Sequence, residues 1–240
     1  MRPYQRACMI TPKSIPIRWF GNREAYERSA LRVVTVGVCP SQVEFLEERF
    51  PDADYADPST YARAWNAYFS RNPYGRWFDN YECLLRGLGA SYYDNAPAPH
   101  RALHTDLCTP HSTTPCWKEL KPAERRALMA EGVKDWHALI AELQPHLMLA
   151  SIPLHLRTEA MQVSGERLFR ELRTTHNGET RRRPVQLTQG TCHGTPVVMG
   201  LTRQTPFGCI HRDELTRLGS EMLQALQSGT LGAEANTPSL

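Results

Sequence analysis

Several features that define other protein classes are missing from this chain of 240 residues. No window approaches the roughly 20 consecutive apolar residues that a membrane-spanning helix needs. The first 20 residues contain no long apolar core of the kind found in signal peptides. The seven cysteines include no CxxC pair, and they are scattered along the chain. We therefore expect a cytoplasmic protein with reduced thiols and no contact with a membrane.

The common catalytic signatures are also missing. The chain contains no GxSxG nucleophile elbow, no phosphate-binding P-loop and no glycine-rich dinucleotide fingerprint. The net charge is only +3, so charge alone does not indicate a protein that binds nucleic acid. Lysine is scarce, because 24 of the 28 basic residues are arginine. Arginine suits phosphates and base edges, although a GC-rich genome also favours it. The cluster Arg181, Arg182 and Arg183 is either a phosphate contact or a solvated loop.

Strand-like and helix-like segments alternate along the sequence. In the first half we expect a buried strand over 31–40, a helix over 41–50, two helices within 57–89 and a strand over 101–107. In the second half we expect a helix over 121–143, a strand over 144–153 and a helical segment from there to about residue 172. A strand pair over 185–202 and a closing helix over 209–227 complete the pattern. This alternation predicts a three-layer α/β domain with a mostly parallel sheet over 31–227. Residues 1–30 are expected to form an extension packed on this core, and residues 228–240 a disordered tail.

Ligands of open α/β sheets bind outside the carboxyl ends of the strands. Three segments leave such ends in the predicted sheet: "GVCPSQVE" (37–44), "HTDLCTPH" (104–111) and "GLTRQTPFG" (200–208). They are the first places at which to expect a functional site.

These segments also allow two simpler interpretations, a zinc site and a reactive cysteine. His104, Cys108, His111 and Cys116 are all residue types that bind zinc, but their spacing matches no standard paired-knuckle pattern, so no metal is expected. Cys39 lies between a strand and a helix start, where a thiolate is stabilised, although a buried, unreactive cysteine is the more common case.

Taken together, the strand ends resemble the motifs of the uracil-DNA glycosylase superfamily, especially its mismatch-specific uracil/thymine branch. "VGVCPS" is similar to the Gly-x-Asn-Pro or Gly-x-Asp-Pro turn, and "NPYGRWFDNYECLLRGLG" to the helix that follows an Asn-Arg-Phe-Trp-type segment. "HTDL" is similar to the strand that ends in Thr-Asn-Leu, and "TRQTPFG" to the final His-Pro-Ser or Asn-Pro-Ser loop. The resemblance covers roughly residues 31–227 in order and implies a flavodoxin-like fold. It also implies an enzyme without a cofactor that takes a base out of DNA and hydrolyses its N-glycosidic bond.

The resemblance also implies roles for individual residues. Trp77 takes the position of the aromatic that stacks on the base, and core packing is its alternative role. Asp106 takes the place of the Asn that reads uracil, unless it is only a loop cap. The turn residues Gly37, Pro40 and Ser41 border the base. Residues of the last motif and of the arginine cluster are expected to contact DNA or the leaving base: Arg181, Arg182, Arg183, Arg203, Gln204, Thr205, Pro206 and Gly208. Thr205 is also expected to be catalytic.

The departures from the family pattern affect the predicted chemistry. Cys39 stands where the family has the Asp or Asn that orients water, and a thiol replaces either poorly. Glu44 lies five residues further along and is the candidate general base, with a surface or helix-dipole role as its alternative. The usual His of the last motif is missing, and Arg203 or Gln204 is expected to donate hydrogen bonds instead.

Asp106 narrows the expected substrate. An ionised carboxylate only accepts hydrogen bonds, so it would repel O4 of uracil and accept from N4–H₂ of a cytosine. Excision of normal cytosine would destroy the host genome. The sequence therefore predicts a monomeric DNA glycosylase acting on a modified cytosine, such as the hydroxymethylated or glucosylated base of phage DNA. A uracil-repair glycosylase and a non-catalytic sensor of modified DNA are the alternatives.

Overall fold

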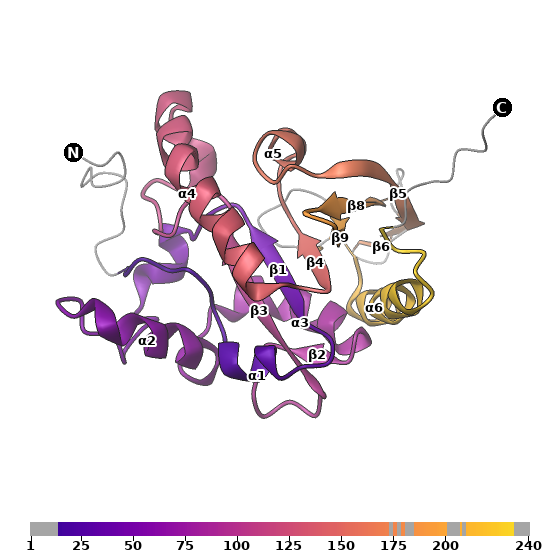
Figure 1. The fold of residues 1–240 in the computed structure, drawn as a ribbon, viewed down its shortest axis with the longest axis horizontal. Helices are drawn as coiled ribbons and strands as arrows, with labels where there is room; N and C mark the ends of the chain where they lie inside the picture. Colours follow the sequence, from indigo (N-terminus) through magenta and orange to yellow (C-terminus); the bar gives the residue numbers. More distant parts are fainter. Residues whose placement is uncertain are drawn as a thin grey trace.

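A seven-stranded sheet runs through the centre of the molecule (Figure 1). The computed structural model describes residues 14–172, 175–176, 179–180, 185–200, 207 and 210–232. In spatial order the strands are β2 (Ala90–Ser91), β3 (His100–Asp106), β1 (Val33–Gly37), β4 (Leu147–Ala150), β9 (Thr195–Met199), β8 (Val185–Cys192) and β5 (Ser164–Leu172). The first five are parallel, and β8 and β5 are antiparallel to their neighbours. A separate two-stranded ribbon pairs β6 (Thr175–His176) with β7 (Glu179–Thr180).

Helices cover both faces of the sheet, which confirms the predicted three-layer α/β fold. The helices are α1 (Arg23–Glu27), α2 (Tyr61–Ala67), α3 (Gly75–Gly87), α4 (Pro122–Leu143), α5 (Leu154–Glu159) and α6 (Arg212–Gln227), with short 3₁₀ turns η2 (Gln42–Leu46), η3 (Pro58–Thr60), η4 (Tyr68–Ser70) and η5 (Trp117–Glu119). Figure 1 shows α4 crossing one face and α3 with α6 on the other. Within the described ranges, no helix is both long enough and apolar enough to cross a membrane.

Close helix packing at two glycines fixes these layers. A Cβ on Gly87 of α3 would lie 1.9 Å from the carbonyl oxygen of Thr216 in α6. A Cβ on Gly132 of α4 would lie 1.9 Å from the carbonyl oxygen of Cys108, in the loop after β3. Both contacts are with backbone atoms, so any side chain at either position would push the two elements apart.

The order of the parallel strands places a crevice at one edge of the sheet. Apart from the two-residue β2, the parallel strands lie in the order β3-β1-β4-β9. The chain leaves β1 toward β3 on one side and then continues to β4 on the other side. Such a reversal is the switch point at which doubly wound sheets bind ligands, outside the carboxyl ends of the strands.

Two predicted elements differ from the structure. The expected helix over 41–50 is only the short 3₁₀ turn η2, although Ser41 caps it as predicted by accepting from the backbone N–H of Val43. The expected helix up to residue 172 ends at Glu159, and strand β5 follows. The sequence of β5, "SGERLFREL", is rich in helix formers, but its backbone pairs with β8 at the sheet edge. Tertiary pairing therefore overrides local propensity here.

The two ends of the described chain pack on the core. Ile15, Ile17 and Phe20 are buried, and Phe20 forms a backbone bridge with His104 of β3. The predicted disordered tail starts at 228, yet Leu231 is buried and the N–H of Gly232 donates to Gln189. The first residues of that segment thus extend the folded part. The domain boundaries stay predictions.

Candidate functional site

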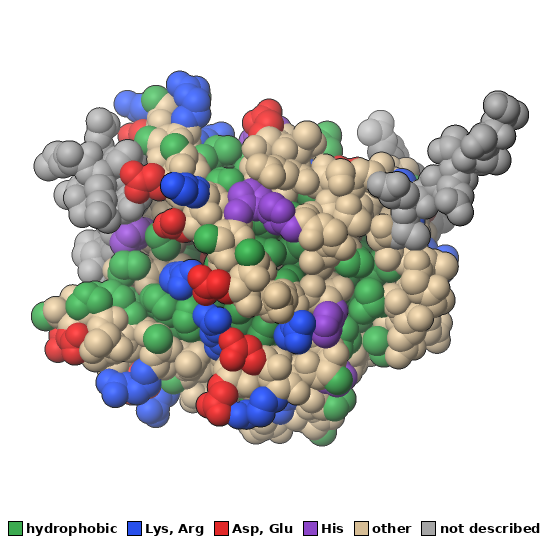
Figure 2. Space-filling model, viewed as in Figure 1, with side chains coloured by type: hydrophobic (Ala, Val, Ile, Leu, Met, Phe, Trp, Pro, Cys, Tyr) green, Lys and Arg blue, Asp and Glu red, His purple; other side chains and the backbone are tan. Residues whose placement is uncertain are grey.

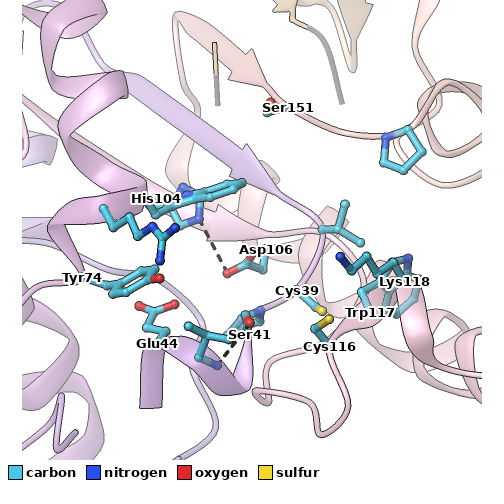
Figure 3. A pocket seen from close by; sticks show the side chains of 16 residues that line it. Cys39, Ser41, Glu44, Tyr74, His104, Asp106, Cys116, Trp117, Lys118 and Ser151 are labelled. Atoms are coloured by element: carbon cyan, nitrogen blue, oxygen red, sulfur yellow. Dashed lines mark hydrogen bonds and ion pairs between the residues drawn. The ribbon is translucent and has the colours of Figure 1, made fainter. Parts of the chain in front are cut away.

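A cavity of about 430 Å³ opens at the switch point of the sheet (Figure 3). Its volume lies within the range of small-ligand sites. The walls come from the loop after β1 (Val38, Cys39, Pro40, Ser41), η2 (Val43, Glu44), the start of α3 (Tyr74, Arg76, Trp77), β3 (His104, Asp106), the segment before and within η5 (Cys116, Trp117, Lys118) and the loop after β4 (Ser151, Pro153). The structure therefore brings together the residues predicted from the first two strand ends and from the helix between them.

Asp106 stands at the end of β3, directly beside the end of β1. Its register partner is Gly37, and a Cβ on that glycine would lie 2.5 Å from Asp106 Oδ1. Gly37 does not line the cavity itself, but its missing side chain leaves the space that the carboxyl group occupies. The Asp106 side chain is only 6% exposed, so few of its contacts are with bulk water.

A chain of buried polar side chains continues behind Asp106. His104 Nε2 lies 3.7 Å from Asp106 Oδ2, and His104 Nδ1 lies 2.8 Å from Thr35 Oγ1. Thr35 Oγ1 in turn lies 2.5 Å from the hydroxyl of Tyr92. Thr35 Oγ1 also donates to the carbonyl oxygen of Leu103 at 3.3 Å. These contacts hold the imidazole in place, and His104 in turn helps to position the Asp106 carboxyl group.

Glu44 is the second carboxyl group of the cavity, and it is also buried. Burial, together with the charge of Asp106, raises the pKa of Glu44 to about 8, although the Tyr68 hydrogen bond and Arg49 act in the opposite direction. The hydroxyl of Tyr68 accepts from the backbone N–H of Tyr74 at 3.0 Å and donates to Glu44 Oε1. The carboxyl proton therefore resides on Oε2. At neutral pH Glu44 is mostly a hydrogen-bond donor, which favours a general acid over the predicted general base.

Arg49 fixes Glu44 relative to the start of α3. Its Nε donates to the carbonyl of Glu44 at 2.5 Å, and its Nη1 donates to the carbonyl of Asn72 at 3.0 Å. The guanidinium carbon also lies 5.5 Å from the ring centroid of Tyr74. One buried cation thus holds two walls of the cavity, although the two walls are some 25 residues apart in sequence.

Cys39 is a protonated thiol in this environment. Its Sγ lies 3.6 Å from Thr113 Oγ1. Burial, and then the charge of Asp106, raises the pKa of the Cys39 thiol well above its ordinary value. Since the thiolate is the reactive form, the geometry assigns Cys39 to the wall of the cavity and offers no activated nucleophile there.

The aromatic wall contains one predicted residue and two that sequence reasoning missed. Trp77 is half-buried, and its ring centroid lies 6.3 Å from that of His104. Tyr74 and Trp117 also line the cavity. Tyr74 lies within the "NPYGRWF" segment, so the sequence does point to it. Trp117 reaches the cavity because the loop that precedes it pairs with the loop after β1, through the bridge between Ser41 and Thr113. No sequence signal marks that loop contact.

Two exposed cations at the mouth of the cavity were also missed. Arg76 and Lys118 line it from opposite segments, α3 and η5. Figure 3 shows Lys118 beside Trp117, on the side away from Glu44 and Tyr74. An anionic group next to a bound ligand would meet positive charge at this opening.

The remaining predictions separate into two groups. The four candidate zinc ligands do not converge among the described residues: His104 and Cys116 line the cavity, Cys108 is buried, and His111 lines a second cavity of about 410 Å³. The predicted DNA-contacting residues lie outside the described ranges, so their placement stays a prediction: Arg181, Arg182, Arg183, Arg203, Gln204, Thr205, Pro206 and Gly208.

Comparison with known proteins adds no identity to this geometry. No family model matches the chain, and no curated protein matches it in sequence. The cavity and its side chains are therefore the basis for inferring what the protein does.

Replacing Glu44 by glutamine is expected to flatten the pH dependence of stability. The folded-state pKa of about 8 lies above the ordinary value of 4.5 for a glutamate, so the folded state retains a proton that the unfolded chain loses. Stability from this group is fully present below about pH 4.5 and is lost as the pH rises toward 8, by on the order of 2 kcal/mol between pH 6 and 8. Thermal unfolding from pH 5 to 9 should show Glu44→Gln gaining on the wild type as the pH rises. A constant difference across this range would contradict the assignment.

Proposed function

We propose that this protein is a DNA glycosylase that takes a modified cytosine out of DNA and hydrolyses its N-glycosidic bond. The observation that carries the proposal is the pair of carboxyl groups in one cavity at the switch point. Asp106 supplies hydrogen-bond acceptors, and Glu44, protonated at neutral pH, supplies a donor on Oε2. Figure 3 shows both groups directed into the same space.

This donor–acceptor pair is complementary to cytosine. The Watson–Crick edge of cytosine presents the N4–H₂ donor beside the N3 and O2 acceptors, and a carboxylate accepts well from N4. Uracil presents O4, which a carboxylate repels, in place of the amine. The site therefore favours a cytosine-like base over uracil. A substituent on the base would have to fit in the rest of the cavity, between the aromatic wall and the loop after β4.

The same pair supports bond cleavage. As the C1′–N1 bond breaks, its electron pair leaves with the base, and negative charge develops on O2 and N3. Glu44 Oε2–H is suited to transfer its proton to that charge as a general acid. Water adds its oxygen to C1′ and releases a proton, which restores Glu44 through solvent. The walls of the cavity limit the entry of other water, and Trp77 provides a face for stacking.

The proposed partner is DNA, bound by a single copy of the chain without a cofactor. Arg76 and Lys118 at the mouth of the cavity are exposed cations that suit the phosphates on either side of a flipped nucleotide. The predicted contacts of Arg203 and its neighbours, and of the Arg181–Arg183 cluster, belong to the same proposal. An enzyme that acts on a base inside a duplex must expose it in this way.

The wild-type protein is expected to form abasic sites in DNA carrying hydroxymethylcytosine or its glucosylated form. It should form them about 10- to 100-fold more slowly in matched DNA carrying uracil, because the Asp106 carboxylate repels O4. The measurement is strand cleavage by alkali after incubation with each substrate. Glu44→Gln should keep DNA binding and lose most of the base release, because it removes the acid.

The outcomes separate the proposal from its rivals. A preference for uracil would identify a repair glycosylase, and it would show that Asp106 does not select a cytosine-like base. Selective binding to modified-cytosine DNA without any abasic sites would identify a sensor, a function consistent with the protonated thiol at the usual water-orienting position. Glu214→Gln on α6 serves as the control for the loss of an acid outside the cavity.

A further inference from the structure

A second cluster of chemically active side chains lies on α4 and the β8–β9 hairpin, and it shares no residue with the candidate functional site. Among the residues that the structure describes, His137, Cys192 and His193 form a group whose potential ligand atoms all lie within 4.8 Å of one another. His137 is half-buried, Cys192 is buried and His193 is exposed. Figure 2 shows histidine side chains gathered on the surface beside α4.

We propose that His137, Cys192 and His193 bind a zinc-type transition-metal ion that joins α4 to the β8–β9 hairpin. Two imidazoles and one thiolate are a ligand set that zinc accepts, with a water molecule as the fourth ligand. The exposure of His193 places the open coordination position toward solvent. The expectation of no metal rests on the loop at 104–116 alone, and no sequence spacing points to this cluster, because His137 lies 55 residues before the adjacent pair Cys192 and His193.

The hydrogen bonds already select the ligand form of His137. Its Nε2 lies 2.8 Å from the carbonyl oxygen of Ala160, which can only accept, so Nε2 carries the proton. The lone pair is therefore on Nδ1, and this atom faces His193 Nε2 at 2.7 Å. A backbone carbonyl that fixes the tautomer is the usual outer partner of a metal-bound histidine.

The β8–β9 turn brings His193 to His137. His193 has φ +49°, and Gly194 follows with φ +76°, so the pair forms the turn between β8 and β9. Two-residue hairpin turns need positive φ at both positions and favour Asn-Gly or Asp-Gly, and histidine is among the non-glycine residues that are enriched at such φ. The turn holds His193 Nε2 at 2.7 Å from His137 Nδ1.

The geometry needs only a small adjustment to hold the ion. Tetrahedral zinc with bonds of about 2.0–2.1 Å to nitrogen separates two ligand nitrogens by about 3.3–3.4 Å, somewhat more than the present 2.7 Å. His193 is on an exposed turn and can swing outward by that amount. Cys192 Sγ now donates to the carbonyl of Met161 at 3.0 Å. On binding, the metal–sulfur bond replaces the S–H bond, and the thiol proton passes to solvent.

The test measures the binding of zinc and of cobalt(II) to the full chain. The metal-free wild type is expected to take up one equivalent of Zn²⁺ and to unfold at a higher temperature when it is bound. Co²⁺ should give an absorption band from thiolate-to-cobalt charge transfer. His193→Asn, which suits the turn, should weaken metal binding by at least about 100-fold, since loss of a mere outer partner already costs 10–100-fold. Cys192→Ser should abolish the cobalt–thiolate band.

His155→Asn, an exposed histidine on α5, is the matched control and should bind metal as the wild type does. Equal metal affinity in the wild type and His193→Asn, or a cobalt complex without the thiolate band in the wild type, would overturn the proposal. So would the absence of stoichiometric uptake. The triad would then be a histidine pair held by a hydrogen bond beside a buried thiol. Because the readouts are metal affinity and spectra, they do not depend on base release.

Discussion

The variant Asp106→Asn is expected to release modified cytosine from DNA about 10- to 100-fold more slowly than the wild type and to gain activity or affinity toward uracil. The substitution keeps the size of the side chain and removes its charge. A hydrogen bond to a charged group contributes about 1.5–3 kcal/mol, against about 0.5–1.5 kcal/mol for a neutral one, and each 1.4 kcal/mol corresponds to a factor of ten. The amide of asparagine also donates to O4 of uracil, which the carboxylate repels.

The measurement is the single-turnover rate of abasic-site formation on modified-cytosine DNA and on uracil DNA for both proteins. Asp213→Asn makes the same chemical change at an exposed position on α6, and it should leave both rates unchanged. Asp106→Asn with wild-type rates on both substrates would show that residue 106 does not read the base. Thermal unfolding of the variant distinguishes a loss of recognition from a loss of folded protein.

The variant Gly132→Ala is expected to lower the free energy of unfolding by about 2–3 kcal/mol. Helix propensity alone would favour alanine inside α4 by about 1 kcal/mol, so the two effects have opposite signs. The clash prevails because the new Cβ would lie 1.9 Å from the carbonyl oxygen of Cys108 and 2.6 Å from the backbone nitrogen of Thr109. Neither backbone group can rotate away. In a chain of this size the expected loss in Tm is roughly 5–10 °C.

Gly75→Ala is the matched control, because the atoms nearest to its new Cβ belong to the flexible carboxyl group of Asp79, at 3.2 Å and beyond. Calorimetry or denaturant unfolding of both variants should show a large loss for Gly132→Ala and a small change for Gly75→Ala. Equal stability of the two variants would mean that α4 can move away from the loop after β3 at little cost.

The features that could be predicted from sequence are those set by local pattern. The all-buried strand β1, the polar residues after the strand ends and the cap at Ser41 follow from hydrophobic period and turn chemistry. From these, parallel-sheet topology places Cys39 and Asp106 at the same edge, because carboxyl ends of neighbouring parallel strands meet there.

The features that could not be predicted depend on contacts between distant segments. The pKa of Glu44 is set by burial and by its neighbour Asp106, and neither its burial nor that distance can be read from a spacing of residues. Trp117 and Lys118 enter the cavity through a loop-to-loop pairing that has no repeating pattern. The sequence of β5 predicts a helix, because Glu, Arg and Leu favour helices, and only the pairing of this segment with β8 makes it a strand.

The empty side-chain position of Gly37 has a consequence for how this protein can diverge. Because the Asp106 carboxyl group occupies the volume that a Cβ of residue 37 would need, the two positions cannot drift independently. A descendant that acquires alanine or a larger residue at 37 must move the carboxyl group of residue 106 or replace it with a smaller side chain. A lineage that retains glycine at 37 remains free to exchange aspartate for asparagine at 106, because the two side chains have nearly the same size. The single missing methyl group thus leaves open an evolutionary path between a charged and a neutral side chain in the cavity.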